Sequence, residues 1–178
     1  MKTYGIIALL CLGFFSKSWA LDYGIGVSLK SYDNSIYLPI KLTNSIFVEP
    51  YFRQQEYSSS YGSGSNSSEE EEVGLGFFAK VTEKNNMSIY YGLRGGYVEQ
   101  IRKHQYVSDK VIEKNSGYRI GPIIGFEYIL FESLSFGAEA EYYKTKLDGS
   151  TKDSVSTDKT RYTTKGTDTR IIVRYFFQ

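Results

Sequence analysis

The chain has 178 residues, with 21 basic and 20 acidic side chains and a formal charge of +1. This balance excludes the strongly basic surface that binds nucleic acids. The length is enough for one domain. The 17 tyrosines, 17 glycines and 11 phenylalanines, against three prolines, favour strands joined by turns.

Residues 1–20 have the features of a secretory signal peptide. Lys2 precedes the apolar run Ile6–Phe15, and Ser18 and Ala20 are small residues at the positions that a signal peptidase reads. An apolar run of about ten residues is too short to cross about 30 Å of hydrocarbon as a helix. We therefore expect cleavage after Ala20 and export through the general secretory pathway.

The only cysteine, Cys11, lies inside this signal segment. Leu10 stands where a lipoprotein signal has Gly or Ala, so lipidation is not expected. The mature chain, residues 21–178, should therefore form one domain without disulfides or thiol chemistry.

Eight segments of the mature chain alternate with the period of two that is typical of β-strands, and no stretch of ten or more residues has a helical period. Pro39 cannot donate a ladder hydrogen bond, which makes the second segment the weakest strand. In chain order the predicted strands are 22–30, 36–42, 46–57, 72–81, 87–97, 118–130, 134–144 and 166–178.

Short and long connections alternate along the predicted strands. The turns 43–45, 82–86 and 131–133 are short, whereas the polar segments 58–71, 98–117 and 145–165 are long, and 31–35 is the one short connection on the long side. Strands of about 9 to 11 residues are long enough to cross a bilayer. The pattern predicts an all-β fold, an eight-stranded antiparallel up-and-down transmembrane β-barrel.

The two faces of these strands predict which side meets lipid. One face is almost entirely apolar or aromatic, and the other combines glycine with charge. A narrow eight-stranded barrel cannot hold all the large apolar side chains inside, which disfavours a soluble periplasmic lipid-binding barrel. We therefore expect a lumen filled by an ionic network, with an ion path as the alternative; its residues are Glu49, Arg53, Arg94, Arg119, Glu127, Glu139, Glu141, Arg170 and Arg174.

Counting from the short turns divides this network into two layers. Glu127, Glu139 and Arg174 fall in the lower layer. The upper layer contains Glu141, Arg170, Arg94 and Arg53.

The last strand is predicted to close the barrel against residues 22–30. Its side chains Ile171, Val173, Tyr175 and Phe177 should face lipid, while Arg170 and Arg174 should pair with lumen glutamates.

With a signal segment, eight strands and an aromatic last strand, the mature chain resembles the small outer-membrane β-barrel family of Gram-negative bacteria, which includes opacity proteins and adhesion and invasion barrels. The resemblance implies location in the outer membrane and contact with its lipid and lipopolysaccharide. It also implies recognition of Tyr175, Phe176 and Phe177 by the barrel-assembly machinery, although Gln178 follows them here.

No catalytic, cofactor or metal site emerges from the sequence, and we expect no enzyme. His104, the only histidine, is predicted in a surface loop, and Tyr106 follows where a lipid deacylase would have serine. The run Glu69–Glu72 lacks the spacing of a calcium loop and predicts a flexible solvated segment. The segment 62–64 lacks the Lys-Ser/Thr of a phosphate loop.

The long polar segments are therefore the predicted carriers of function. We expect a monomer whose mobile external loops support envelope integrity or adhesion, through contacts with host or cell-surface ligands. A small channel for ions or hydrophobic solutes is the alternative. Basic residues gather in two of these loops and could bind lipopolysaccharide phosphates; they are Arg102, Lys103, Lys110, Lys114, Lys144, Lys146, Lys152, Lys159, Arg161 and Lys165.

Overall fold

The computed structural model describes residues 22–30, 33–61, 64–105, 110–152 and 157–177. The predicted signal peptide and Gln178 lie outside these residues. Within the described ranges, no helix has the length and apolarity needed to cross a bilayer.

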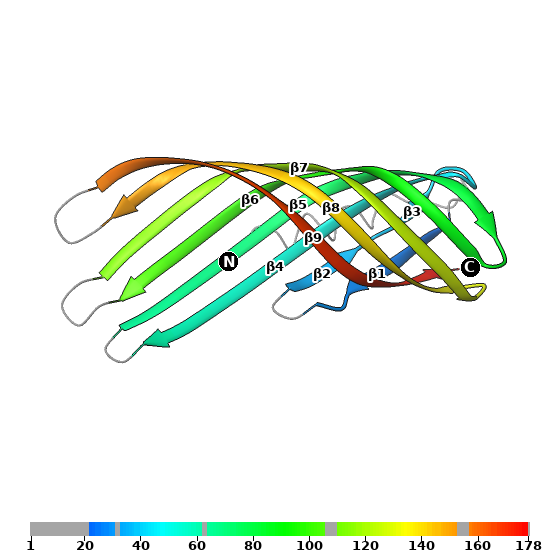
Figure 1. The fold of residues 1–178 in the computed structure, drawn as a ribbon, viewed down its shortest axis with the longest axis horizontal. Coiled ribbons are helices and arrows are strands. Elements are labelled where there is room, and N and C mark those ends of the chain that lie inside the picture. Colours follow the sequence, from blue (N-terminus) through cyan, green and yellow to red (C-terminus); the bar gives the residue numbers. More distant parts are fainter. Residues whose placement is uncertain (1–21, 31–32, 62–63, 106–109, 153–156, 178) are drawn as a thin grey trace.

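All described elements are antiparallel strands, which wrap into one tilted barrel (Figure 1). The prediction of an eight-stranded up-and-down barrel is confirmed, with its second strand divided into two pieces. The strands are β1 (Tyr23–Ser28), β2 (Asp33–Tyr37), β3 (Ile40–Lys41), β4 (Ile46–Tyr61), β5 (Gly64–Lys84), β6 (Met87–Gln105), β7 (Lys110–Phe131), β8 (Leu134–Lys152) and β9 (Thr157–Phe177).

The second strand of the barrel is interrupted by Pro39. β2 and β3 both lie between β1 and β4 and pair with both. Pro39 has no N–H to donate, but its carbonyl accepts from Gly24 N at 2.8 Å, and Leu38 N donates to Pro50 O at 2.9 Å. Hydrogen bonds to both neighbouring strands therefore continue across the interruption.

The barrel closes between β9 and β1. Their register runs from Tyr23 opposite Phe177 to Ser28 opposite Ile172, as predicted for the last strand. At the short-turn end, Asn85 and Asn86 connect β5 to β6 with φ values of 51° and 62°. Positive φ at both turn residues is the geometry whose twist suits a two-residue hairpin, and asparagine tolerates it.

The apolar face points outward. Along β9, Ile171, Tyr175 and Phe177 are exposed, whereas Ile172 and Arg174 between them are buried. The same alternation exposes Leu75 and Phe77 on β5, each at 53%. Exposed apolar side chains around the barrel form a continuous belt suited to hydrocarbon, with the charges inside.

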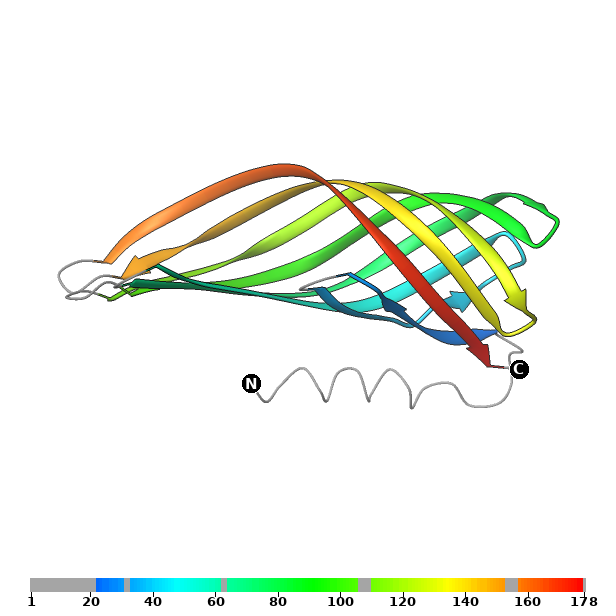
Figure 2. The ribbon, with the colours of Figure 1, turned by 60° about the horizontal axis from the view of Figure 1, so that its bottom comes forward.

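The predicted long loops are strands instead. Six strands, β4 to β9, extend 16 to 22 residues, well beyond what the belt needs. The parts beyond the belt form one curved sheet that projects past β1 and β2 (Figures 1 and 2). We call this the projecting sheet; it comprises 58–61, 64–71, 98–105, 110–117, 145–152 and 157–165.

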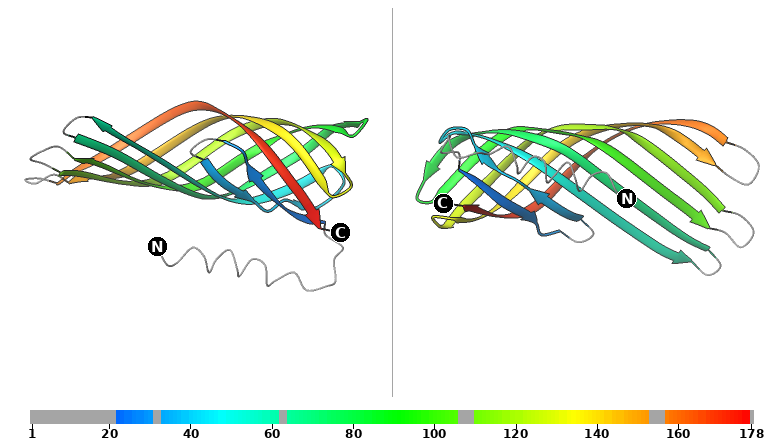
Figure 3. Two further views of the ribbon diagram at one scale, coloured as in Figure 1. Left: turned by 90° about the horizontal axis from the view of Figure 1, so that it is seen from below. Right: turned by 180° about the vertical axis from the view of Figure 1, so that it is seen from behind.

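The prediction of mobile loops was wrong, because those segments continue the strands. Both of their faces are polar, so no alternation of apolar and polar residues marks them as strands in the sequence. Serine, threonine and charged side chains suit a sheet with water on either side, and only the tips 62–63, 106–109 and 153–156 lie outside the described strands. The short β1–β2 connection leaves the projecting sheet open on one side, as the views from below and behind show (Figure 3).

Replacing Ile171 with Arg should destabilise the barrel by about 2 to 4 kcal/mol, because the substitution places a charge in the apolar belt. The matched control is Thr163→Arg, which lies on the same outward face of β9 but in the projecting sheet and should change stability little. Equilibrium urea unfolding in phospholipid vesicles measures both. Equal stability of the two variants would contradict the outward assignment of the apolar face.

Candidate functional site in the lumen and on the projecting sheet

Two arginines and two glutamates form a closed ring across the lower lumen. Arg94 on β6 donates to Glu49 on β4 at 2.7 Å and to Glu139 on β8 at 2.8 Å. Arg174 on β9 donates to the same two carboxylates at 2.8 and 2.9 Å. All four side chains are almost completely buried, so each charge depends on its partners in the ring.

A third carboxylate extends this ring toward the short turns. Glu127 lies 3.5 Å from Arg174 and 3.5 Å from Lys80, and the Ser135 hydroxyl donates to it at 2.6 Å. The lower cluster thus contains three cations and three anions. Balanced charge and multiple hydrogen bonds are the conditions under which buried ions are tolerated.

A second cluster lies nearer the projecting sheet. Arg53 donates to Glu72 at 3.2 Å and lies 3.5 Å from Glu141, and Arg170 also pairs with Glu141. Arg119 bridges Glu72 at 2.8 Å and Glu70 at 2.7 Å. Charged residues therefore cross the lumen at two levels.

Sequence reasoning missed Glu70 and Glu72, because the run Glu69–Glu72 is predicted to be flexible and solvated. The run lies in β5, and alternate carboxylates point in opposite directions. Extending the alternation back from Gly74 would have placed Glu72 and Glu70 on the lumen face.

Aromatic rings fill the lumen around the ions. The Arg94 guanidinium lies 5.0 Å from the centre of the Tyr37 ring and 5.3 Å from that of Phe78. Tyr90 donates to Glu139 at 2.8 Å. Glycine makes room for such rings: a Cβ on Gly125 would lie 2.6 Å from Tyr90 Cε2.

All nine residues of the predicted network lie buried in the barrel interior. Arg170 pairs with Glu141, and Arg174 pairs with Glu139 and Glu127. The layer prediction was wrong for Arg94, which joins the lower cluster. The error arose from counting along separate strands, because strand tilt and long side chains displace the charged atoms from the Cα level.

The candidate contact surface beyond the lumen is the projecting sheet. Its inner face continues from the lumen, and a hollow of about 320 Å³ lies at the junction between them. Amide, hydroxyl, carboxylate and phenol groups surround this hollow; the lining residues are Lys30, Gln55, Glu56, Tyr57, Ser68, Glu70 and Gln100.

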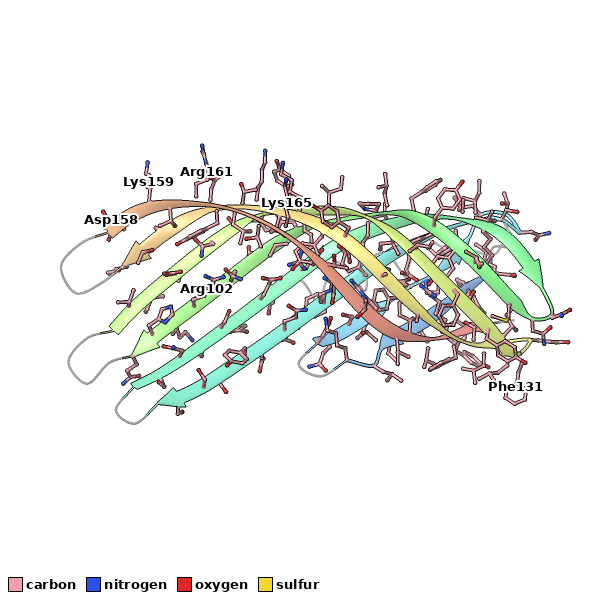
Figure 4. The ribbon with its side chains drawn as sticks, in the orientation of Figure 1. Arg102, Phe131, Asp158, Lys159, Arg161 and Lys165 are labelled. Carbon is pink, nitrogen blue, oxygen red and sulfur yellow. The ribbon has the colours of Figure 1, made fainter. Side chains whose placement is uncertain are left out.

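The outer face of β9 in this sheet is basic. Lys159, Arg161 and Lys165 point outward (Figure 4). Arg161 donates to Asp148 on β8 at 2.6 Å, and that hydrogen bond raises the pKa of the guanidinium. Both partners are largely exposed, so the pair adds little to stability.

His104 is also a strand residue, which contradicts its predicted place in a loop. It lies near the end of β6, half-buried, and its Nδ1 is 3.0 Å from Asn66 Oδ1 on β5. Tyr106 and the segment 62–63 lie outside the described residues. Among the described side chains, no group of three or more His, Cys, Asp or Glu has the arrangement of a metal site.

The predicted assembly residues end β9. Tyr175 and Phe177 are on the outer face, where the Phe177 ring lies 5.3 Å from that of Tyr23. Phe176 points the other way, and the Lys41 ammonium lies 4.3 Å from its ring centre. Side chains therefore hold the last strand to both β1 and β3, in addition to its ladder with β1.

Replacing Arg94 with Met should destabilise the protein by about 3 to 5 kcal/mol, because Glu49 and Glu139 would each lose a buried partner. The control Arg161→Met removes an exposed ion pair and should leave unfolding unchanged. Urea unfolding in vesicles compares the two. A wild-type unfolding curve for Arg94→Met would contradict the buried ring.

No protein-family model matches the chain, and no curated protein is similar in sequence. Solved structures do match it. A major outer membrane protein from Thermus thermophilus superposes with a TM-score of 0.66 at 10% identity, covering 89% of this chain and all of that one.

Two further structures match most of both chains. Neisserial surface protein A has a TM-score of 0.52 at 12% identity, covering 88% of this chain and 94% of its own. Ail, the attachment invasion locus protein of Yersinia pestis, has a TM-score of 0.52 at 15% identity, and the match covers 88% of this chain and 95% of Ail. The chain therefore has the fold of the small outer-membrane β-barrels, the family that its sequence resembles.

Proposed function

We propose that this protein is a surface-exposed outer-membrane adhesin, a binding protein and not an enzyme, whose projecting sheet makes the contacts. The observation that carries this proposal is the length of β4 to β9, at 16 to 22 residues each. About 9 to 11 residues suffice to span a bilayer. The remaining residues build an ordered surface outside it, on a rigid scaffold.

The composition of the projecting sheet supports contact with hydrated, hydroxyl-rich ligands such as glycans. The hollow at its base is lined by side chains that donate or accept hydrogen bonds, including Gln55, Ser68 and Gln100. Tyr57 adds an aromatic face that is 58% exposed. A small number of precisely placed polar groups beside an aromatic ring is typical of sites that bind small ligands.

The ligand of a structure with a similar fold suggests a compound with which to test this proposal. Ail of Yersinia pestis has been crystallised in complex with the heparin analogue sucrose octasulfate, at a TM-score of 0.52 and 16% identity to this chain. That complex belongs to Ail. The basic outer face of β9 makes a sulfated glycan a suitable test ligand here, beside neutral oligosaccharides.

Shortening the projecting sheet should abolish adhesion while the barrel persists. Removing 55–70, 99–116 and 147–162, each replaced by Asn-Gly, cuts the three hairpins at residues that face each other in the ladders and removes every lining residue of the hollow except Lys30. Binding of expressing cells to immobilised neutral and sulfated glycans should fall to background. Heat-modifiable migration on gels, which reports a folded barrel, should remain.

Point variants separate the hollow from the rest of the sheet. Tyr57→Ala should weaken glycan binding by about tenfold, the loss of one well-packed aromatic contact. Ser60→Ala, on the outer face of the same strand, should have no effect. Undiminished binding by the shortened protein would refute the adhesion proposal, and steady conductance in planar bilayers would favour a channel.

A further inference from the structure

The outer face of β8 carries a groove within the apolar belt. Two successive outward residues, Ala138 and Ala140, are small, whereas their neighbours across the ladders are larger. Ala138 lies between Phe126 and Ile171, and Ala140 lies between Ile124 and Thr169. The resulting groove has a volume of about 680 Å³; Leu29, Ile89, Ile124, Phe126, Ala138, Ala140, Thr169 and Ile171 contribute outward side chains to it.

This groove has the shape and surroundings for a hydrocarbon chain. The outward side chains that line it are apolar except for the Thr169 hydroxyl, and it extends across neighbouring strands from Leu29 to Ile89 in the part of the barrel that faces lipid. Glu139 and Arg170 also line it, but both are buried. A straight acyl chain seated over the two alanines would contact side chains of three strands at once.

Two lysines face each other just outside the groove. Along β8 the outward residues after Ala140 are Tyr142 and Lys144, and Lys144 lies directly opposite Lys165 on β9. Directly opposed residues on one face have Cβ atoms about 5 Å apart, and like charges in this position repel. Among the described residues, no carboxylate forms an ion pair with either lysine.

A third cation lies beside this pair. Lys146 follows Lys144 on the same face of β8, and its ammonium is 5.9 Å from the centre of the Tyr118 ring on β7. An anion placed among the three lysines would relieve their repulsion. A phosphate carries the required charge and several acceptor oxygens.

The spacing joins the two features into one site. Lys144 lies four positions after Ala140, which is about 13 Å along a strand, with Tyr142 as the outward residue between them. A ligand that fits both must carry an anionic headgroup and a hydrocarbon chain that runs from it into the bilayer. The opposite side of the barrel is unsuitable, because Glu71 on β5 and Glu99 on β6 are the facing outward residues beyond the belt there.

We propose that β8 and β9 hold one molecule of lipid A, the phosphorylated and acylated anchor of lipopolysaccharide. A phosphate lies among Lys144, Lys146 and Lys165, and an acyl chain occupies the groove over Ala138 and Ala140. The site rests on the outer-membrane location within the proposed function, but it does not depend on adhesion.

The test measures lipid A bound to the purified, detergent-folded protein by native mass spectrometry. Wild type should retain lipid A in preference to dephosphorylated lipid A and to phosphatidylglycerol. Lys144→Gln with Lys165→Gln should weaken retention by about tenfold or more, because two cations near the lipid phosphate are lost. Ala140→Phe, which fills the groove without changing charge, should also weaken it.

Lys152→Gln with Lys159→Gln is the matched control, since it removes the same charge from the same outer face nearer the tip of the hairpin. This control should retain lipid A as wild type does. Equal losses in the two double variants would show unspecific charge attraction and overturn the site, as would equal retention of phosphatidylglycerol. Heat-modifiable migration checks folding of each variant, and the preference of wild type for phosphorylated lipid A tests the proposal without any variant.

Discussion

Backbone hydrogen bonding inside the apolar belt is the constraint on which the rest of the structure depends. Hydrocarbon offers no partner to N–H and C=O groups, so the strands have to close through β9 and β1. Eight strands leave a lumen that side chains fill. Charges placed there have to pair, and the ring of Glu49, Arg94, Glu139 and Arg174 does so from four different strands. The ring therefore holds together strands that are not all neighbours.

The projecting sheet has a different physical basis. Outside the belt, water can satisfy backbone groups, so nothing in the bilayer requires six strands to continue. They continue without β1 and β2, which leaves free edges on β4 and β9. Lysine on an edge strand discourages pairing with another chain, and Lys159 and Lys165 stand on β9. The sheet is thus an ordered surface, stabilised by its ladders and open on one side.

The barrel and its inside-out pattern were predictable because membrane strands alternate strictly between lipid and lumen. Residues such as Ile171 and Arg174 are therefore assigned by position alone. The projecting sheet was not recognised because polar residues on both faces, as in Glu69–Glu72 or Thr163–Lys165, look the same in a solvated strand and in a loop. Pairing across the lumen was predictable only in part: the charge pattern identifies Arg94 as buried, but its partners depend on strand tilt and side-chain reach.

A nitroxide scan along β9, from Lys159 to Val173 in lipid vesicles, tests the central claim most directly. The only cysteine in the sequence is Cys11, so single cysteines can be introduced for labelling. The account predicts that positions 171 and 173 are accessible to oxygen and that positions 170 and 172 are immobilised. Positions 159, 161, 163 and 165 should be ordered and accessible to a water-soluble nickel chelate. Uniformly mobile labels from 159 to 165 would contradict the projecting sheet, and oxygen access at 170 and 172 would contradict the filled lumen.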